Sequence, residues 1–262
     1  IDPEVYARFI AARSRVEARG EENLVTAQAE LEAIVQEAPD YAPAYGALAI
    51  AVLERWRTTR TIPANEARSV AKAATERALE LAPDNDYVLT AHGAYLSELV
   101  ENANDEGLRR VNDVFRRAIE INPENVDAMY FLAFNLRWLE EYEETIEVID
   151  AAVRIDPLNR PARHMRIWAL TENGRIDEGI EYARRSYELF PDDTSFLFRV
   201  FFAEHVRGRP DRALAWLYAT RATGDRAFRL EYEAAASLGF ALNQVDGKTV
   251  MITSSGPSDG KS

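Results

Sequence analysis

The chain has no cysteine and only three histidines, His92, His164 and His205, among its 262 residues. Without cysteine it can form no disulfide, and it has no thiolate to act as a nucleophile or to hold zinc or an iron–sulfur cluster. The histidines are far apart in sequence, whereas the ligands of a metal must converge on one point. We therefore expect no metal site and no thiol chemistry.

Long apolar segments and enzyme motifs are also missing. No run approaches the roughly 20 apolar residues of a membrane-spanning helix, and no secretory signal is visible. The sequence contains no glycine-rich phosphate loop and no Gly-x-Ser-x-Gly elbow. We expect a soluble, non-catalytic protein without a cofactor, in the cytoplasm or periplasm. Because the chain begins at Ile1 and not at methionine, we also expect processing or an upstream segment.

Basic residues are fewer than acidic ones. Lys and Arg number 31 against 44 Asp and Glu, which gives a net charge of −13. The acidic excess runs along the whole chain, so the surface is expected to repel nucleic acid and anionic membranes. This leaves proteins or peptides, including a second copy of the chain, as the expected partners.

A short phrase centred on proline is present five times. The prolines are 44, 40, 34 and 34 residues apart. They are Pro39, Pro83, Pro123, Pro157 and Pro191. A 34-residue period is typical of repeats built from one helical pair each, in which proline follows the second helix. The first two intervals then contain insertions, one after Trp56 and one at residues 102–107, which we interpret as lengthened loops.

Small residues give a second mark in the same register. Twelve positions before each proline stand Ala27, Ala71, Val111, Thr145 and Gly179. Seven positions further on stand Ile34, Ala78, Ala118, Ala152 and Ser186. Most of these side chains are small, as is needed where two helices cross closely.

These residues resemble the tetratricopeptide repeat (TPR) family over about residues 5–224. The resemblance implies an all-α, right-handed superhelical solenoid of antiparallel helix pairs. The expected array is 1–225, with five repeats ended by the prolines above and a degenerate sixth at 194–225. A capping helix is expected at 226–245 and a flexible tail at 246–262.

A weaker resemblance lies in residues 4–13 and 27–49. They are similar to the first repeats of bacterial regulators in which the array follows a winged-helix or adenylate cyclase domain. This resemblance implies an effector domain before Ile1 and a regulatory role for the repeats.

In the TPR family the first helices line the concave face, and here the side chains expected on that face differ along the array. Repeats one to three offer mainly small residues, namely Gly46, Ala47, Thr90, Ala91 and Ala94. Repeats four to six offer Tyr130, Phe131, Phe134, Arg137, Trp138, His164, Met165, Trp168, Phe198, Arg199, Phe202 and His205. Aromatic and arginine side chains dominate binding hot spots. We expect a groove there.

Three interpretations of this groove remain open. It could be an open site for a protein or peptide partner, which would make the chain an interaction scaffold. It could be filled by residues 228–243 or by a second copy. A shift of register would instead make the same residues ordinary core. An alternative function is a regulatory domain that senses a small molecule.

Overall fold

A computed structural model describes residues 1–99, 105–193 and 195–208, without the side chains of residues 205 and 206. By its internal contacts the chain divides into one unit at 1–186 and another at 187–262. Over the described residues it consists of helices and contains no strand. The all-α class expected from the repeats is therefore confirmed.

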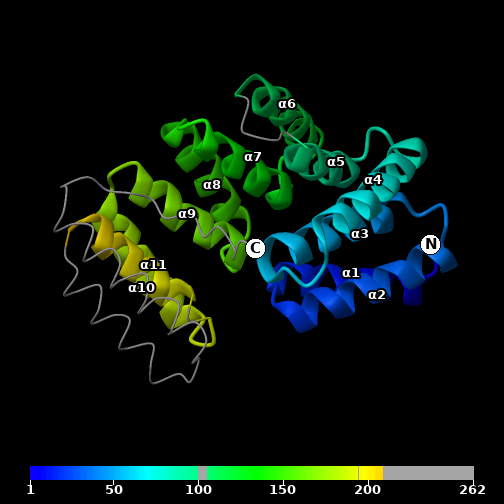
Figure 1. Ribbon diagram of the computed structural model, residues 1–262, viewed down its shortest axis with the longest axis horizontal. Coiled ribbons are helices and arrows are strands. Elements are labelled where there is room, and N and C mark those ends of the chain that lie inside the picture. The colour runs from blue at the N-terminus through cyan, green and yellow to red at the C-terminus, as the bar shows by residue number, and fades with distance from the viewer. Residues whose placement is uncertain (100–104, 194, 209–262) are drawn as a thin grey trace, which may run out of the picture. The chain divides into compact units, whose positions relative to one another are not determined.

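The first unit is a series of helix pairs that follow one another along the chain (Figure 1). The first three pairs are α1 (Pro3–Ala18) with α2 (Glu21–Glu37), α3 (Ala42–Glu54) with α4 (Ala64–Leu81), and α5 (Asp86–Leu99) with α6 (Asp105–Ile121). The next are α7 (Val126–Trp138) with α8 (Tyr142–Ile155), and α9 (Arg160–Glu172) with α10 (Ile176–Leu189). The second unit contributes α11 (Ser195–Val206).

Each recurring proline lies in the turn that separates two pairs. The carbonyl of the preceding residue accepts a hydrogen bond from the N–H three residues later, as between Ala38 and Tyr41 at 3.0 Å. Proline suits the second position of such a turn because its ring fixes φ near −65°. The pattern repeats in the turns 82–85, 122–125, 156–159 and 190–193. The proline phrase therefore ends one helix pair and sets the start of the next.

Asparagine at the end of a turn caps the following helix. The Oδ1 of Asn125 accepts from the N–H of Ala128 at 2.8 Å, and the Oδ1 of Asn159 accepts from Ala162 at 2.9 Å. Each bond satisfies one of the N–H groups that the first helical turn leaves without a partner. These caps fix the N-termini of α7 and α9, which line the site described below.

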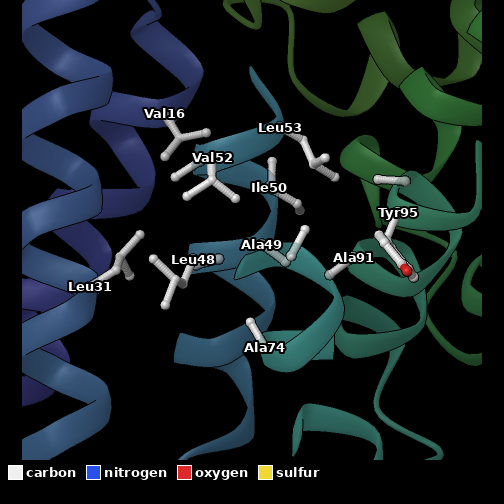
Figure 2. Close-up of a cluster of buried hydrophobic side chains, with 14 of the residues drawn as sticks. Val16, Leu31, Leu48, Ala49, Ile50, Val52, Leu53, Ala74, Ala91 and Tyr95 are labelled. Carbon is white, nitrogen blue, oxygen red and sulfur yellow. The ribbon is translucent and has the colours of Figure 1, made fainter. Parts of the chain in front are cut away.

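The core is built from close helix crossings. Both sets of small residues that the sequence placed twelve and five positions before the prolines are buried, including Ala27 and Ala71. The most enclosed helix is α3, which contacts α1, α2, α4 and α5 and is buried at every position from Gly46 to Glu54. Figure 2 shows Leu31 and Val16 on one side of α3 and Ala91 and Tyr95 on the other.

The small residues expected on the inner face of repeats one to three serve this packing. Gly46, Ala47, Thr90, Ala91 and Ala94 are all buried. A Cβ added at Gly46 would lie 3.3 Å from the Cβ of Ala91. α3 and α5 thus approach closely, and no open groove is formed by these residues.

A π-helical turn, Arg55–Thr59, follows α3 and contains the start of the insertion after Trp56, which continues through the loop to α4. The second insertion lies partly in residues 100–104, outside the described residues. The expected capping helix, the tail and most of the sixth repeat also lie outside them. Among the described helices, none is both long and apolar enough to cross a membrane.

Gly93→Ala is expected to destabilise the fold. A Cβ at this position would lie 2.5 Å from Cε1 of Phe115, a ring that is fully buried and stacks on Phe131. Overpacking of this kind costs about 1–3 kcal/mol, which outweighs the roughly 0.5–1 kcal/mol that alanine gains over glycine in a helix. Urea unfolding followed by circular dichroism measures the difference.

The control is Gly46→Ala. Its added Cβ lies 3.3 Å from the nearest neighbouring atom, so this change is expected to lower the free energy of unfolding by less. A Gly93→Ala protein as stable as the parent would contradict the close crossing of α5 and α6.

Candidate partner-binding site

The first helices of the pairs contact one another in sequence along one side of the first unit. α1 contacts α3, α3 contacts α5, α5 contacts α7, and α7 contacts α9. We call this side the inner face. α1 also contacts α9, so the two ends of this series meet.

The inner face of α7 carries a stripe of large side chains. Asp127, Tyr130, Phe134 and Trp138 follow one another at spacings of three or four residues, which places them along one side of a helix. Tyr130 and Phe134 are half-buried, whereas Trp138 is 54% exposed. The stripe runs from the capped N-terminus of α7 to its C-terminus.

Arg13 of α1 covers the start of this stripe. Its Nη2 lies 3.1 Å from Oδ2 of Asp127, and its guanidinium lies 4.3 Å from the centroid of the Tyr87 ring. The contact joins residues 114 positions apart in sequence. It therefore links the first helix to the seventh across the inner face.

Arg19 and Arg57 cover the middle of the stripe. Arg19 donates to the hydroxyl of Tyr130 at 2.8 Å, and the Arg57 guanidinium lies 4.5 Å from the centroid of the Phe134 ring. Glu54, only 4% exposed, lies between them, 3.5 Å from Arg19 and 3.4 Å from Arg57. Arg57 also pairs with Glu98 at 3.3 Å. We call Arg13, Arg19 and Arg57 the inner arginine row.

Two of these arginines lie in uncommon backbone conformations that direct their side chains toward α7. Arg19 has φ of 56° where the chain turns from α1 into α2, a conformation uncommon for residues other than glycine. Arg57 lies in the π-helical turn, which changes the direction of the side chains that follow α3. Both irregularities bring a guanidinium onto α7.

A separate group lies at the C-terminal end of α7. The Arg137 guanidinium forms two hydrogen bonds with Glu172, at 2.6 and 2.8 Å. It also lies 4.4 Å from the centroid of the Trp168 ring and 5.3 Å from that of Trp138. Trp138 stays largely in solvent above this group.

A cavity of about 480 Å³ opens at the other end of α7. Its walls come from α1, from the start of α3, and from the turns and N-termini of α5, α7 and α9. The lining residues are Tyr6, Phe9, Ile10, Arg13, Glu17, Tyr41, Pro43, Asp86, Tyr87, Asn122, Glu124, Asn125, Val126, Asp127, Ile155, Asp156 and Asn159. The cavity thus combines aromatic rings, apolar side chains and acids.

Burial dominates the ionisation of several lining groups. It raises the pKa of the Asp127 carboxyl, although Arg13 opposes the shift. Burial, and then the charge of Asp127, raise the pKa of Glu17, again against Arg13. Burial likewise raises the pKa of the Tyr87 phenol. At these three groups burial outweighs the opposing charge of Arg13.

Three solved structures share this architecture over most of the chain. PilW, a widely conserved type IV pilus biogenesis factor, is 12% identical, with a TM-score of 0.60 over 89% of this chain and 100% of PilW. A thermophilic TPR protein of Thermus thermophilus is 16% identical, with a TM-score of 0.57 over 75% of this chain and 98% of its own. A tetratricopeptide repeat protein of Parabacteroides merdae is 17% identical, with a TM-score of 0.51 over 94% of each chain.

The chain has the TPR fold. A scan of protein-family profiles and a search of curated proteins found no match. At identities of 12–17% the likeness establishes the TPR fold, and the partner must be argued from the side chains.

The structure distributes the predicted groove residues over several environments. Phe131 and Met165 are buried in the core, at 5% and 1% exposure. Tyr130, Phe134, Arg137, His164 and Trp168 are half-buried, and Trp138 is exposed. Phe198, Arg199 and Phe202, all half-buried, belong to α11 in the second unit. The side chain of His205 lies outside the described residues.

The inner arginine row and the cavity were not predicted. Arg57 stands in an insertion, and Arg13 and Arg19 lie in the first repeat, where the aligned positions gave no sign of contact with the fourth. The spacing of Asp127 before Tyr130 and Phe134 was the one available signal. Among the described residues no group of three or more His, Asp or Glu could hold a metal ion.

Arg57→Met is expected to destabilise the protein by about 2–4 kcal/mol, because it removes the ion-pair partner of the mostly buried Glu98 and one of the two cations that pair with Glu54. The double variant Arg57→Met/Glu98→Gln should lose less than the sum of the single changes, by at least about 1 kcal/mol. Urea unfolding of the four proteins gives this coupling. Strict additivity would mean that the Arg57–Glu98 pair contributes nothing to the fold.

Glu17→Gln is expected to stabilise the protein at pH 7 and to lose this advantage as the pH falls to about 4. A carboxyl whose pKa is raised by folding binds its proton more tightly in the native state, so its ionisation destabilises the fold. The penalty is absent below the ordinary glutamate pKa of about 4.3 and grows as the pH rises through the folded value. Arg13 keeps Asp127 as a partner in the variant.

Urea unfolding between pH 4 and 8 measures this difference, with Glu147→Gln on the exposed side of α8 as the matched change. A difference between Glu17→Gln and the parent that stays constant with pH would contradict the prediction.

Proposed function

We propose that this chain is a non-catalytic scaffold that binds a protein or peptide partner on the inner face of its first unit. The observation that carries the proposal is the cavity of about 480 Å³, walled by five different helices or their turns. A concave site assembled from several repeats suits an extended segment that contacts each repeat in turn. The proposal requires no catalytic group.

Exposed apolar side chains at both ends of α7 support this function. At the cavity, Tyr6 is 48% exposed and Ile10 is 42% exposed. At the far end, Trp138 is 54% exposed. Large apolar side chains at the surface, next to a cavity or another aromatic group, are typical anchors for a partner.

Between these ends the inner arginine row lies over Tyr130 and Phe134. The proposed site therefore has two contact regions, the cavity and the group of Arg137, Trp138 and Trp168. His164 lies on the same helix as Trp168 and extends the second region. Phe198, Arg199, Phe202 and His205 are proposed as a further contact surface, which belongs to the second unit.

A small-molecule sensor is the second candidate function. The volume of the cavity favours it, because small-molecule sites commonly measure about 300–1,000 Å³. A sensor would be stabilised against heat by its ligand, and a peptide scaffold by its peptide.

Ile10→Ala is expected to weaken peptide binding about tenfold, because Ile10 offers an exposed apolar anchor at the cavity. Random dodecamer peptides displayed on phage are first selected on the complete chain. The selected peptides are then synthesised, and their affinities are measured by fluorescence polarisation. Val25→Ala on α2, with 40% exposure against 42% for Ile10, is the matched control and should bind as the parent does.

Trp138→Ala, measured in the same assay, tests the second contact region. If selection yields no binder, the scaffold function is wrong, and stabilisation by metabolites in a thermal-shift screen would then favour the sensor. If binders are found and none of these variants weakens them, the inner face is not the site.

A further inference from the structure

The cavity has far more negative than positive charge on its walls. Its acids are Glu17, Asp86, Glu124, Asp127 and Asp156, and its one basic side chain is Arg13. Arg13 lies 3.1 Å from Asp127 and 3.8 Å from Glu17. One guanidinium and five carboxylates thus line the cavity, and no ion pair to a described residue compensates Asp86, Glu124 or Asp156.

The other acids have neutral partners. Asp86 accepts hydrogen bonds from the side-chain amides of Asn122 and Asn125, both at 2.8 Å. Asp156 accepts from the main-chain N–H of Leu158 at 3.0 Å. Glu124 is exposed at the rim. These contacts hold Asp86 and Asp156 in position without neutralising them.

Aromatic rings form the wall beside these acids. Phe9 packs edge-on against Tyr41, with ring centroids 5.1 Å apart, and Tyr6 lies next to Phe9 at 6.3 Å. Arg13 already lies over the Tyr87 ring, which demonstrates that this wall accepts a cation. A cation over an aromatic face is attracted by the negative potential of the ring, and more strongly as it is desolvated.

Asn159 supplies a hydrogen-bond donor to the cavity. It is only 9% exposed and lines the cavity. Its Oδ1 caps α9 through Ala162, whereas its Nδ2 makes no hydrogen bond to any of the described residues. This amide N–H group reaches the open cavity and is available to an acceptor on a ligand. The natural acceptor for this N–H group is a main-chain carbonyl of a bound segment.

We propose that the cavity binds a lysine or arginine side chain of an extended segment of a partner protein. The carboxylates of the cavity take the positive charge, the tyrosine wall packs on the aliphatic part of the side chain, and Asn159 Nδ2 donates to the main chain of the segment. The inference rests on the scaffold function proposed above and names the chemistry of its partner.

Charge complementarity selects this occupant over a second copy of the chain, whose own net charge is −13. The free Asn159 amide favours a peptide over a simple polyamine, because an ammonium group offers no acceptor to an N–H donor. A basic partner segment satisfies both the acids and the amide.

The test uses the complete chain and a fluorescein-labelled probe of six alternating Lys-Ser units. The matched probes carry Nε-acetyl-lysine or glutamate in place of lysine. The double variant Glu124→Gln/Asp156→Asn removes two cavity charges and keeps the oxygen that accepts from Leu158. Glu143→Gln/Glu147→Gln makes the same change of charge on exposed positions of α8.

The lysine probe is expected to bind, and the acetylated and glutamate probes at least tenfold more weakly. The cavity variant should raise the Kd of the lysine probe about tenfold, because it removes two charged acceptors and charge-assisted hydrogen bonds are stronger than neutral ones. The control variant should change Kd by less than about twofold, because distant exposed charges are screened.

Equal weakening by both double variants would overturn the proposal, because it would show attraction to the acidic surface in general. Displacement of the probe by spermidine at an equal molar concentration would also overturn it, in favour of a free polyamine. If the phage-selected peptides bind while the lysine probe does not, the scaffold function stands and the cationic specificity is wrong. If no peptide binds at all, both fail.

Discussion

Close packing of the first helices in repeats one to three determines how the inner face is built. Glycine and alanine at Gly46, Ala47, Ala91 and Ala94 leave little side-chain volume between α3 and α5. When one side of a helical array is packed this tightly, successive pairs turn toward that side. This turning brings α1 into contact with α9 and brings Arg13 within ion-pair distance of Asp127. The small residues therefore control which distant side chains can meet.

The inner arginine row is a consequence of that narrow interior. Glu54 and the ring of Phe134 would face water in a wider array, but here they lie beneath Arg19 and Arg57. Ion pairs removed from water gain little net stability, since desolvation offsets much of the attraction. Their effect is geometric, because Arg13 and Arg19 each reach from the first repeat to a partner on α7. The row thus fixes the relative positions of α1, α3 and α7.

The sequence was sufficient to predict features set by local geometry. Pro39 and its four counterparts mark the turns because a proline turn needs only four residues, and Ala27 or Ala71 mark helix crossings within one pair. The row could not be predicted, because Arg13 and Asp127 meet only through the accumulated curvature of four repeats. The curvature of the array also explains why the predicted groove residues lie in different environments. Phe131 and Tyr130 are adjacent in sequence, yet one is core and the other lies under Arg19.

The position of the cavity follows from the turns that the prolines create. The last residue of each turn precedes the first helix of the next pair. At Asn125 and Asn159 the Oδ1 of this residue caps that helix. Its Nδ2 is then left for a partner other than the capped helix. At Asn125 that amide is taken by Asp86 and Thr90, and at Asn159 it remains available. A repeat array can thus acquire a binding site without a specialised loop, because the asparagine caps at Asn85, Asn125 and Asn159 each present an amide, and the neighbouring side chains decide which amide stays free for a partner.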